Sequence, residues 1–401
     1  MTATMPGFSS RERGCMASSV IRTALASLLS LAILPVLAHA LPPGQVFSEV
    51  KDALKDGQRL NFAMPVEGID DVKPSRKSVA EGRPHTELVI RSITLEQRKD
   101  WWGLRDLCVK WTKSDPENTV AWHGLGLAYA YLKRSDAAID AYREALRINP
   151  EWAAAWYNLG VVYADLKRYD DAIDAHRQAL RIDPEDADVW NTLGNTYANL
   201  KRYDAAIEAY REALRIKSVW GIAWYNLGLA YLNFKRYDDA IDAYREVTRI
   251  KPKWAVAWSD LGIAYGSLKR YDAAIDAFRE ALRIRPKWAA AWYNIGITYA
   301  ELKRTDDAID AYRQALRINP DYARAWYNLG VAYSNRNLYD AAIEALRQAI
   351  RIKPEDAAAW YGLGVAYALS GNQTALRQAI RELRRLDPPG ADRLSGWIKK
   401  E

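Results

Sequence analysis

A period of 34 residues organises most of this 401-residue chain and constrains its fold more than any other feature. Tryptophan recurs at that interval without a slip, at Trp122, Trp156, Trp190, Trp224, Trp258, Trp292, Trp326 and Trp360. A leucine or isoleucine follows each tryptophan by three residues, a glycine by four and a tyrosine by seven. Self-similarity at a fixed interval of this length indicates a repeat protein, in which similar supersecondary units stack in one direction.

Each unit of the repeat has the pattern of two helices. In the second unit, the tryptophan, leucine, glycine and tyrosine lie at i, i+3, i+4 and i+7, which is one face of a helix. A polar break at residues 167–170 follows, in which Asp170 is expected to cap the next helix. Pro184 ends that helix, and a proline closes every unit except the one that ends at Ser218, which marks a weak junction. The repeated tryptophans are expected to lie in the core.

This spacing resembles the tetratricopeptide repeat (TPR) family, whose W-x2-L-G-x2-Y, A-x3-F/Y and closing-proline pattern matches eight units over residues 119–390. The resemblance implies an all-α fold, a right-handed superhelical solenoid of helix–turn–helix hairpins. Residues 85–118 lack the Trp-Leu-Gly signature but keep Leu104, Cys108 and Trp111 at helical spacing, so a degenerate capping repeat is expected there. Residues 391–401, with Trp397, are expected to form the C-terminal cap.

The N-terminal 40 residues have the pattern of a secretory signal peptide. Arg11, Arg13 and Arg22 precede an apolar stretch at 23–37, which ends in the A-x-A site Ala38-His39-Ala40. A membrane anchor is the alternative, but the stretch is short for a span and contains a proline. Cleavage near Ala40 predicts a periplasmic or secreted protein, and either Met1 or Met16 could be the start.

A second resemblance lies between the signal peptide and the repeats, within the expected irregular segment 41–84. Residues 44–68, including Leu60-Asn61-Phe62-Ala63, resemble the edges of a secreted trypsin-like serine protease domain of the high-temperature-requirement type. An unrelated linker is the alternative. No G-[DN]-S-G-G nucleophile loop occurs in the chain, so the machinery of serine-protease catalysis is absent from the sequence.

No other motif indicates catalysis, a metal or a cofactor. The sequence contains no phosphate loop, dinucleotide fingerprint, H-E-x-x-H or CxxC. Only four histidines and two cysteines are present, and His123, His176 and Cys108 fall on helical faces where packing explains them. We therefore expect a protein that is not an enzyme and that holds no metal or cofactor.

The informative positions are those that packing does not need. By the TPR resemblance, the two residues after each tryptophan face the concave side, where asparagine ladders of similar arrays hold extended polypeptide. An asparagine amide can both donate to and accept from a peptide backbone, and tyrosine supplies rigid contact area. The predicted groove residues are Tyr157, Asn158, Asn191, Asn195, Tyr225, Asn226, Tyr293, Asn294, Arg324, Tyr327, Asn328 and Tyr361.

The chain carries 57 basic and 50 acidic side chains, a formal charge of +7, which does not require a nucleic-acid partner. Lys-Arg pairs recur at the expected turns, from Lys133-Arg134 to Lys303-Arg304, where they form a solvated rim or make weak contact with an anionic cell-envelope polymer. The sequence thus predicts a non-enzymatic scaffold that binds a protein or peptide. The alternatives are an envelope-assembly element that binds anionic polysaccharide and a degenerate member of a secreted serine protease–TPR family. The oligomeric state stays open.

Overall fold

The computed structural model describes residues 76–398, with side chains from Glu87 onward, and every regular element in this range is a helix. The predicted signal peptide and the protease-like segment at 44–68 lie outside the described residues. The helices group into two compact units that divide between Leu200 and Lys201, and each unit is described by itself. None of the described helices combines the length and the apolar character that crossing a bilayer requires.

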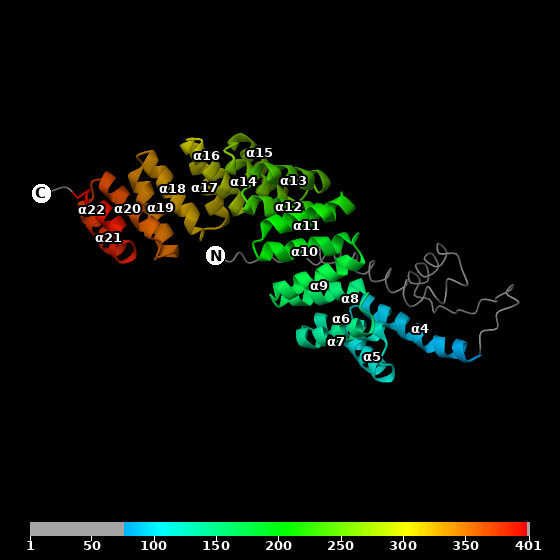
Figure 1. Ribbon diagram of the computed structural model, residues 1–401. Coiled ribbons are helices and arrows are strands. Elements are labelled where there is room, and N and C mark those ends of the chain that lie inside the picture. The colour runs from blue at the N-terminus through cyan, green and yellow to red at the C-terminus, as the bar shows by residue number, and fades with distance from the viewer. Residues whose placement is uncertain (1–75, 399–401) are drawn as a thin grey trace. The chain divides into compact units, whose positions relative to one another are not determined.

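Each unit is a stack of helical hairpins that follow one another in sequence order (Figure 1). Unit 1 contains α4 (Arg76–Gln97), α5 (Trp101–Ser114), α6 (Thr119–Tyr131), α7 (Ser135–Ile148), α8 (Ala153–Asp165), α9 (Tyr169–Ile182) and α10 (Ala187–Asn199). Unit 2 contains α11 (Tyr203–Ile216), α12 (Gly221–Asn233), α13 (Tyr237–Ile250), α14 (Ala255–Ser267), α15 (Tyr271–Ile284), α16 (Ala289–Glu301), α17 (Thr305–Ile318), α18 (Ala323–Asn335), α19 (Tyr339–Ile352), α20 (Ala357–Leu369), α21 (Gln373–Leu386) and α22 (Pro388–Ser395). Even-numbered helices up to α20 are the first helices of their hairpins.

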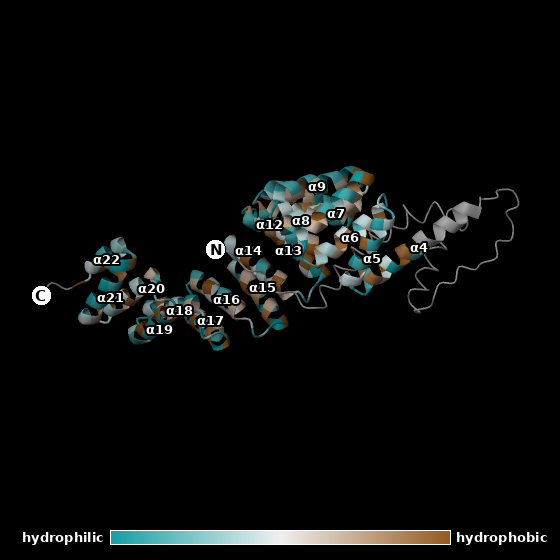
Figure 2. Ribbon diagram, turned by 90° about the horizontal axis from the view of Figure 1, so that it is seen from below, coloured by the Kyte–Doolittle hydropathy of each residue, from teal (hydrophilic) through white to brown (hydrophobic). Residues whose placement is uncertain are grey.

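Within each unit the stack is held together because second helices, such as α7 and α13, pack both on their own first helix and on the first helix of the next hairpin. Hydrophobic and hydrophilic residues are mixed along the helices of both units (Figure 2). A single hairpin therefore cannot bury its apolar side chains alone, and stacking removes them from water. This all-helical arrangement of consecutive hairpins confirms the predicted fold class.

The glycine four residues after most of the tryptophans is required because a side chain of a later helix, in five cases a ring, lies against it. A β-carbon at Gly262 of α14 would lie 2.7 Å from Phe278 of α15, and one at Gly228 would lie 2.8 Å from Tyr244. Both rings are 2% exposed or less. In the last hairpin, Leu394 of α22 lies against Gly364, so this short helix covers the end of unit 2.

The repeated tryptophans are mostly buried, and the indole Nε1 of most of them donates to a backbone carbonyl six residues earlier. Trp224 makes this bond to Ser218 at 2.8 Å, so the unit without a proline keeps the contact. Asp170 does not cap α9, because the helix already begins at Tyr169 and places this carboxylate in its first turn. There it interacts favourably with the helix N-terminus.

The chain ends differ in their bounds from the predicted segments. Residues 76–84, expected to be irregular, form the first turns of α4, in agreement with the helix-favouring Ala80 and Glu81. The terminal helix α22 begins at Pro388, before the expected cap at 391–401. The proposed division of the chain into domains otherwise stays a prediction.

Candidate functional site

The first helices form one face of each unit, which we call the inner face. In unit 1, α6 contacts α8 and α8 contacts α10, and in unit 2, α14, α16, α18 and α20 contact one another in the same way. Successive second helices make weaker contacts. First helices of neighbouring hairpins therefore lie closer together than second helices do, and the residues after each tryptophan belong to this closer-packed side.

Aromatic side chains that directly follow three of the tryptophans, His123, Tyr225 and Tyr293, each lie against two other rings. The ring of Tyr225 lies 5.9 Å from Tyr244 of its own hairpin and 4.6 Å from Trp254 of the next. Tyr293 has the same relation to Tyr312, at 6.0 Å, and to Tyr322, at 4.8 Å. Burial raises the pKa of Tyr225 and of Tyr293, and it raises that of Tyr157 in unit 1 to about 12. These rings are half-buried and held in fixed orientations.

Polar residues of the inner face join neighbouring hairpins, a role that the repeat pattern does not predict. A side chain directly after one tryptophan bonds to the residue 35 positions later: His123 Nε2 and Asn158 Nδ2 lie 2.9 Å apart, and Tyr225 donates to Asp260 over 2.8 Å. Asn328 donates to the Tyr293 hydroxyl over 3.2 Å. We call these contacts the inter-hairpin ladder. In this ladder the amides of Asn158 and Asn328 make hydrogen bonds to other residues of the protein, although each amide keeps further hydrogen-bonding capacity.

The ladder is broken at two places in unit 2, and each break leaves a polar group unused. Ser259 stands where other hairpins have a ring, so it is too short to reach Asn294, and the amide of Asn294 has no hydrogen bond among the described residues. Gly362 stands where other hairpins have a polar side chain. The Tyr327 ring therefore lies over Gly362, where a β-carbon would be 3.6 Å from it, and its hydroxyl is likewise unpaired within residues 76–398.

Asn294 of α16 and Tyr327 of α18 belong to neighbouring first helices that contact each other. Arg324 lies one turn before Tyr327, is exposed, and is close enough to Tyr293 and Tyr322 to lower their pKa against the rise caused by burial. One turn after the tyrosine row comes an aliphatic row of partly exposed side chains, Leu229, Ile263, Ile297, Val331 and Val365. Amide, hydroxyl, guanidinium and aliphatic surface are thus combined around α16 and α18.

The remaining predicted groove residues divide between the two units. Tyr157, Asn158, Asn191 and Asn195 lie on α8 and α10 of unit 1, where Asn191 is buried and the other three are half-buried. Tyr225 and Asn226 lie on α12, and Tyr361 on α20, where the Arg393 guanidinium of α22 lies 5.8 Å from its ring. The structure brings the residues of α16 and α18 together, and a binding role for any of the twelve stays a prediction.

Two residues that the prediction left out, His123 and Asp260, belong to the same network. Asp260 occupies a site where burial raises its pKa to about 6, and the hydrogen bond from Tyr225 opposes that rise. His123 is buried beside Trp152, at a ring distance of 4.5 Å. The signal that could have found both is the pairing of positions 35 residues apart.

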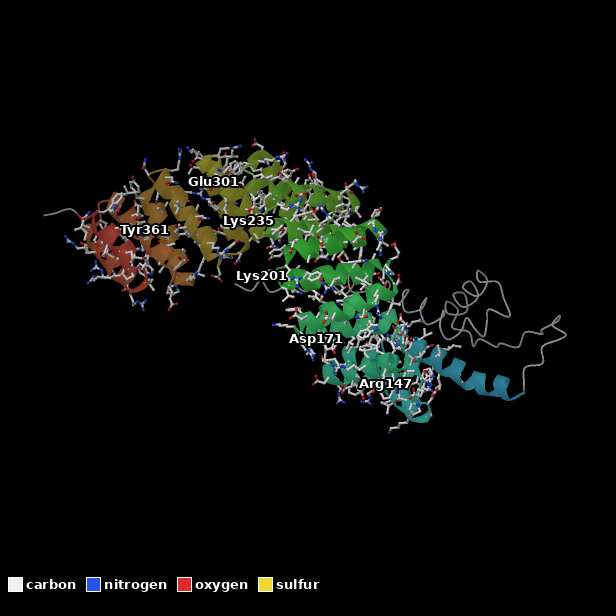
Figure 3. All side chains as sticks on the ribbon, in the orientation of Figure 1. Arg147, Asp171, Lys201, Lys235, Glu301 and Tyr361 are labelled. Carbon is white, nitrogen blue, oxygen red and sulfur yellow. The ribbon has the colours of Figure 1, made fainter. Side chains whose placement is uncertain are left out.

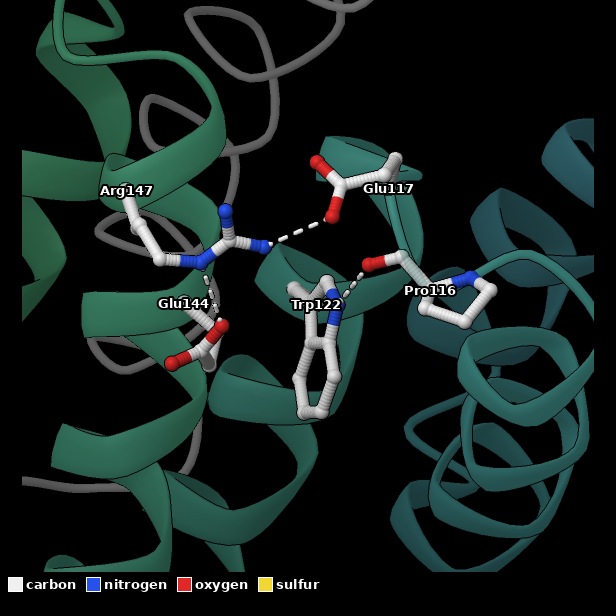
Figure 4. A network of polar contacts seen from close by, with 5 residues as sticks. All are labelled: Pro116, Glu117, Trp122, Glu144 and Arg147. Carbon is white, nitrogen blue, oxygen red and sulfur yellow. Dashed lines mark hydrogen bonds and ion pairs between the residues drawn. The ribbon is translucent and has the colours of Figure 1, made fainter.

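A second ladder runs along the other side of the first helices. An arginine of each second helix from α7 to α19 donates to the hydroxyl of the signature tyrosine 20 residues later, as Arg245 does to Tyr265 over 3.0 Å. The same bond recurs at Arg143, Arg177, Arg211, Arg279, Arg313 and Arg347. Arg147 similarly links Glu144 of its own helix to Glu117 of the preceding loop, beside the Trp122–Pro116 bond (Figure 4). These side chains serve to hold the stack.

Two shallow pockets lie at equivalent positions over the half-buried Trp156 and Trp224, with volumes of about 460 Å³ and 390 Å³. Arginines from one hairpin and aspartates from the next form the walls of each. Since opposite charges face each other and Arg143 and Arg211 already bond to tyrosines, these pockets have no clear preference for a ligand. We place the candidate site on the inner face.

Burial moves the pKa of three side chains in unit 1 away from neutrality. Burial lowers the pKa of His123 and of His176 to about 4, and it raises that of the Cys108 thiol to about 12, so none is a ready base or nucleophile at neutral pH. Between Glu87 and Ile398, no group of three or more metal-binding side chains is found. The polar groups that face outward are suited to binding.

Stacked 34-residue hairpins with a polar, tyrosine-rich inner face define an α-helical repeat protein of the scaffold class. Residues 186–388, just over half of the chain, match the model of the Cilia and flagella-associated protein 70 C-terminal domain, and residues 120–185 and 151–218 match a tetratricopeptide repeat model. The chain therefore belongs to the family of TPR domains that these models describe. The TPR fold is generally non-enzymatic and is that of a protein–protein interaction scaffold.

The chain is also similar to several solved structures. The chain is similar to MamA, at 28% identity and a TM-score of 0.40 over 41% of this chain and 96% of that one. It is similar to YrrB, described as a TPR protein with an unusual peptide-binding site, at 24% identity and 0.41 over 47% and 96%. The C-terminal part of a TPR repeat-containing protein from Cytophaga hutchinsonii matches at 17% identity and 0.54 over 60% and 98%, and supports the fold. A search of curated proteins found no match.

Proposed function

We propose that this protein is a non-enzymatic scaffold that binds an extended polypeptide segment on the inner face of unit 2, centred on α16 and α18. The observation that carries the proposal is the pair of breaks in the inter-hairpin ladder. They leave the Asn294 amide and the Tyr327 hydroxyl without partners among the described residues, on adjacent first helices. Elsewhere on this face of unit 2, Tyr225 and Tyr293 hold polar neighbours inside the protein.

An extended polypeptide matches this chemistry. The free amide can donate to a backbone carbonyl and accept from a backbone N–H, without regard to the partner's sequence. The tyrosine row and the aliphatic row, including Ile263 at 38% exposure, offer apolar contact on either side of the amide. The ladder fixes the neighbouring rings beforehand, so binding immobilises few side chains and costs little entropy. We further propose that the protein acts outside the cytoplasm, after cleavage of the predicted signal peptide near Ala40.

Selection from a random peptide display library tests the proposal. We expect peptides that bind the full chain and that lose at least about tenfold in affinity when Asn294→Ala, Arg324→Ala and Tyr327→Ala are combined, because about two hydrogen bonds and a ring contact disappear. A matched control combines Asp310→Ala, Gln314→Ala and Arg317→Ala on the outer helix α17, and should bind normally. Equal binding by both variants, or no selected peptide, would contradict the proposal.

A further inference from the structure

The first helices of unit 2 are almost free of charged side chains. From α12 to α20 they contain none except Asp260 on α14, Glu301 on α16 and Arg324 on α18. Glu301, labelled in Figure 3, is the last residue of its helix and accepts a hydrogen bond from Tyr271 at 3.4 Å. The other hairpins of unit 2 have asparagine or glycine where Asp260 stands, and alanine, valine or isoleucine where Arg324 stands. Packing and helix formation therefore do not require these two charges.

Asp260 is a half-buried carboxylate that lacks a cationic partner. Its Oδ2 accepts the hydrogen bond from Tyr225, which uses one of the two oxygens. No arginine, lysine or histidine between Glu87 and Ile398 forms an ion pair with it. Burial raises the pKa of this carboxyl to about 6, and only the bond from Tyr225 opposes the rise. A carboxylate in such surroundings is stabilised by a cation that approaches it from solvent.

The surroundings of Asp260 suit the side chain of a lysine or an arginine. The Tyr225 ring, whose hydroxyl bonds to Asp260, lies 4.6 Å from the Trp254 ring. Lys251 lies 5.2 Å over that indole and makes no ion pair with Asp260 among the described residues. Aromatic rings attract cations to their faces, and a carboxylate beside them adds a charge-assisted hydrogen bond.

Arg324 is an exposed cation without an ion pair among the described residues. It is close enough to the inter-hairpin ladder to lower the pKa of Tyr293 against the effect of burial. Asp356, which raises the pKa of Tyr327 on the same helix as Arg324, already caps α20 and pairs with Lys353 at 3.6 Å. The Arg324 guanidinium is therefore free to bind an anionic group of a partner.

A polypeptide that crosses the first helices of unit 2 meets these two charges in a fixed order. α14 contacts α16, and α16 contacts α18. Helices in contact lie about 10 Å apart, so roughly 20 Å separates Asp260 from Arg324. An extended chain covers that distance with about six residues. The turns and loops beyond the helix ends carry charges of both signs, in pairs such as Arg236–Asp239 and Arg304–Asp307, so they do not favour one sign of partner.

We propose that Asp260 binds a lysine or arginine side chain of the polypeptide held on the inner face, and that Arg324 binds an aspartate or glutamate about six residues away in the same polypeptide. The proposal rests on the proposed function, which places an extended segment across α16 and α18. Asn294 lies on the helix between the two charges, so a segment that bonds to its amide reaches both. An amide accepts either direction of a polypeptide, whereas two opposite charges select one.

Selection from a random peptide display library against the full chain tests the inference. Parallel selections use the single variants Asp260→Asn and Arg324→Ala, which install residues found at these positions in other hairpins of unit 2. The control variant is Asp276→Asn. It removes one negative charge from α15, where this exposed aspartate pairs with Arg279 at 3.5 Å. Circular dichroism melting verifies that all three variants stay folded.

We expect peptides selected by the parent to be enriched in a basic and an acidic residue about six positions apart. Asp260→Asn should remove the enrichment of the basic residue and Arg324→Ala that of the acidic one, whereas Asp276→Asn should retain both. In a selected peptide, exchange of the basic residue for glutamine should weaken binding to the parent at least about fivefold, and to Asp260→Asn within about twofold, because the ion pair is already lost there.

Two results separate this inference from the proposed function. Selected peptides without the charge pattern, or with the same pattern on Asp260→Asn, would overturn the inference and leave the proposed function standing. If Asn294→Ala combined with Tyr327→Phe binds the selected peptides as the parent does, while the basic residue is still recognised through Asp260, the inference stands and the amide–hydroxyl site is wrong. A library that yields no binding peptide would refute both.

Discussion

At the scale of the residue, the lysine with a positive φ in the turn between two helices is the energetically least favourable residue that this chain repeats. The same two hydrogen bonds close the turn at Lys269 and at Gly371, so the residue type changes the local energy and leaves the geometry unaltered. A β-carbon in this region costs about 1–2 kcal/mol. The favourable interaction between the lysine charge and the helix C-terminus offsets about 0.3–1 kcal/mol of that cost.

Lys269→Gly should therefore leave the free energy of unfolding unchanged or raise it, because the relief of strain offsets the greater freedom that glycine has in the unfolded chain. Lys269→Val should lower it by about 1 kcal/mol or more, since a β-branched side chain tolerates this conformation worst. Urea denaturation followed by circular dichroism measures both. A glycine variant less stable than the valine variant would show that the turn needs the lysine side chain.

Residue-scale contacts also show how far the sequence could predict the site. The period of 34 places the hairpins of the regular repeats, because it reports the spacing of buried residues directly, whereas the bounds of α4 and α22 lie outside it. The inter-hairpin ladder could not be foreseen from one unit, since it depends on which atoms of two helices meet at an interval of 35 residues. Asn294 has the same local sequence as Asn158 and Asn328, and only Ser259 in the preceding hairpin leaves it without a partner.

At the scale of the element, α14 contains two glycines with opposite surroundings. Gly262 faces the Phe278 ring of α15 so closely that no β-carbon fits, whereas a β-carbon at Gly266 would meet nothing within 4 Å. The first glycine fixes the distance between the helices of the hairpin, and the second only lowers the helix propensity of α14. The two glycines therefore allow the effect of close packing to be compared with the effect of helix propensity within one helix.

Gly262→Ala should destabilise the protein by about 1–3 kcal/mol, because Phe278 must shift in a closely packed core. Gly266→Ala should stabilise it by about 0.5–1 kcal/mol through the gain in helix propensity. Thermal unfolding of the two single variants, measured against the parent chain, tests both signs. If the two substitutions changed the stability in the same direction, the close approach of α14 and α15 would not be the reason for the glycine at position 262.

At the scale of the whole molecule, the two units differ in how they respond to acid. Unit 1 contains the buried His123 and His176, both with the pKa lowered to about 4, and residues 201–401 contain no histidine. The nitrogens of His176 have no hydrogen-bond partner among the described residues, so the folded state favours its neutral form. Protonation of the unfolded chain begins near pH 6.5, well above the folded value.

Because these folded pKa values are depressed, the stability of unit 1 is complete above about pH 6.5 and is lost as the pH falls toward 4. Each histidine should remove roughly 1–2 kcal/mol at pH 5. Glu96 acts in the opposite direction, since burial raises its pKa to about 7, and Asp260 does so in unit 2. Hydrogen exchange at pH 7 and pH 5 should show the amides of α8 and α9 losing protection before those of α14 and α15.

His176→Tyr, which installs the residue found at this position in α7 and α13, should remove the contribution of His176 to this acid response. Comparing the hydrogen exchange of α9 in the parent and in the variant isolates that contribution, because Glu96 and Asp260 are unchanged in the variant. An unaltered loss of protection in α9 between pH 7 and pH 5 would assign the acid response to other groups.

The bonds from each arginine to the tyrosine 20 residues onward have one further consequence. Every hairpin of unit 2 from α12–α13 to α18–α19 presents the same donor to its successor and the same acceptor to its predecessor. Excising or inserting any stretch of 34 residues within unit 2 therefore rejoins matching surfaces, whereas half that length would set a first helix against another first helix. A gene with this repeat can gain or lose whole 34-residue units. The length of the stack then changes, while the contacts between neighbouring hairpins stay the same.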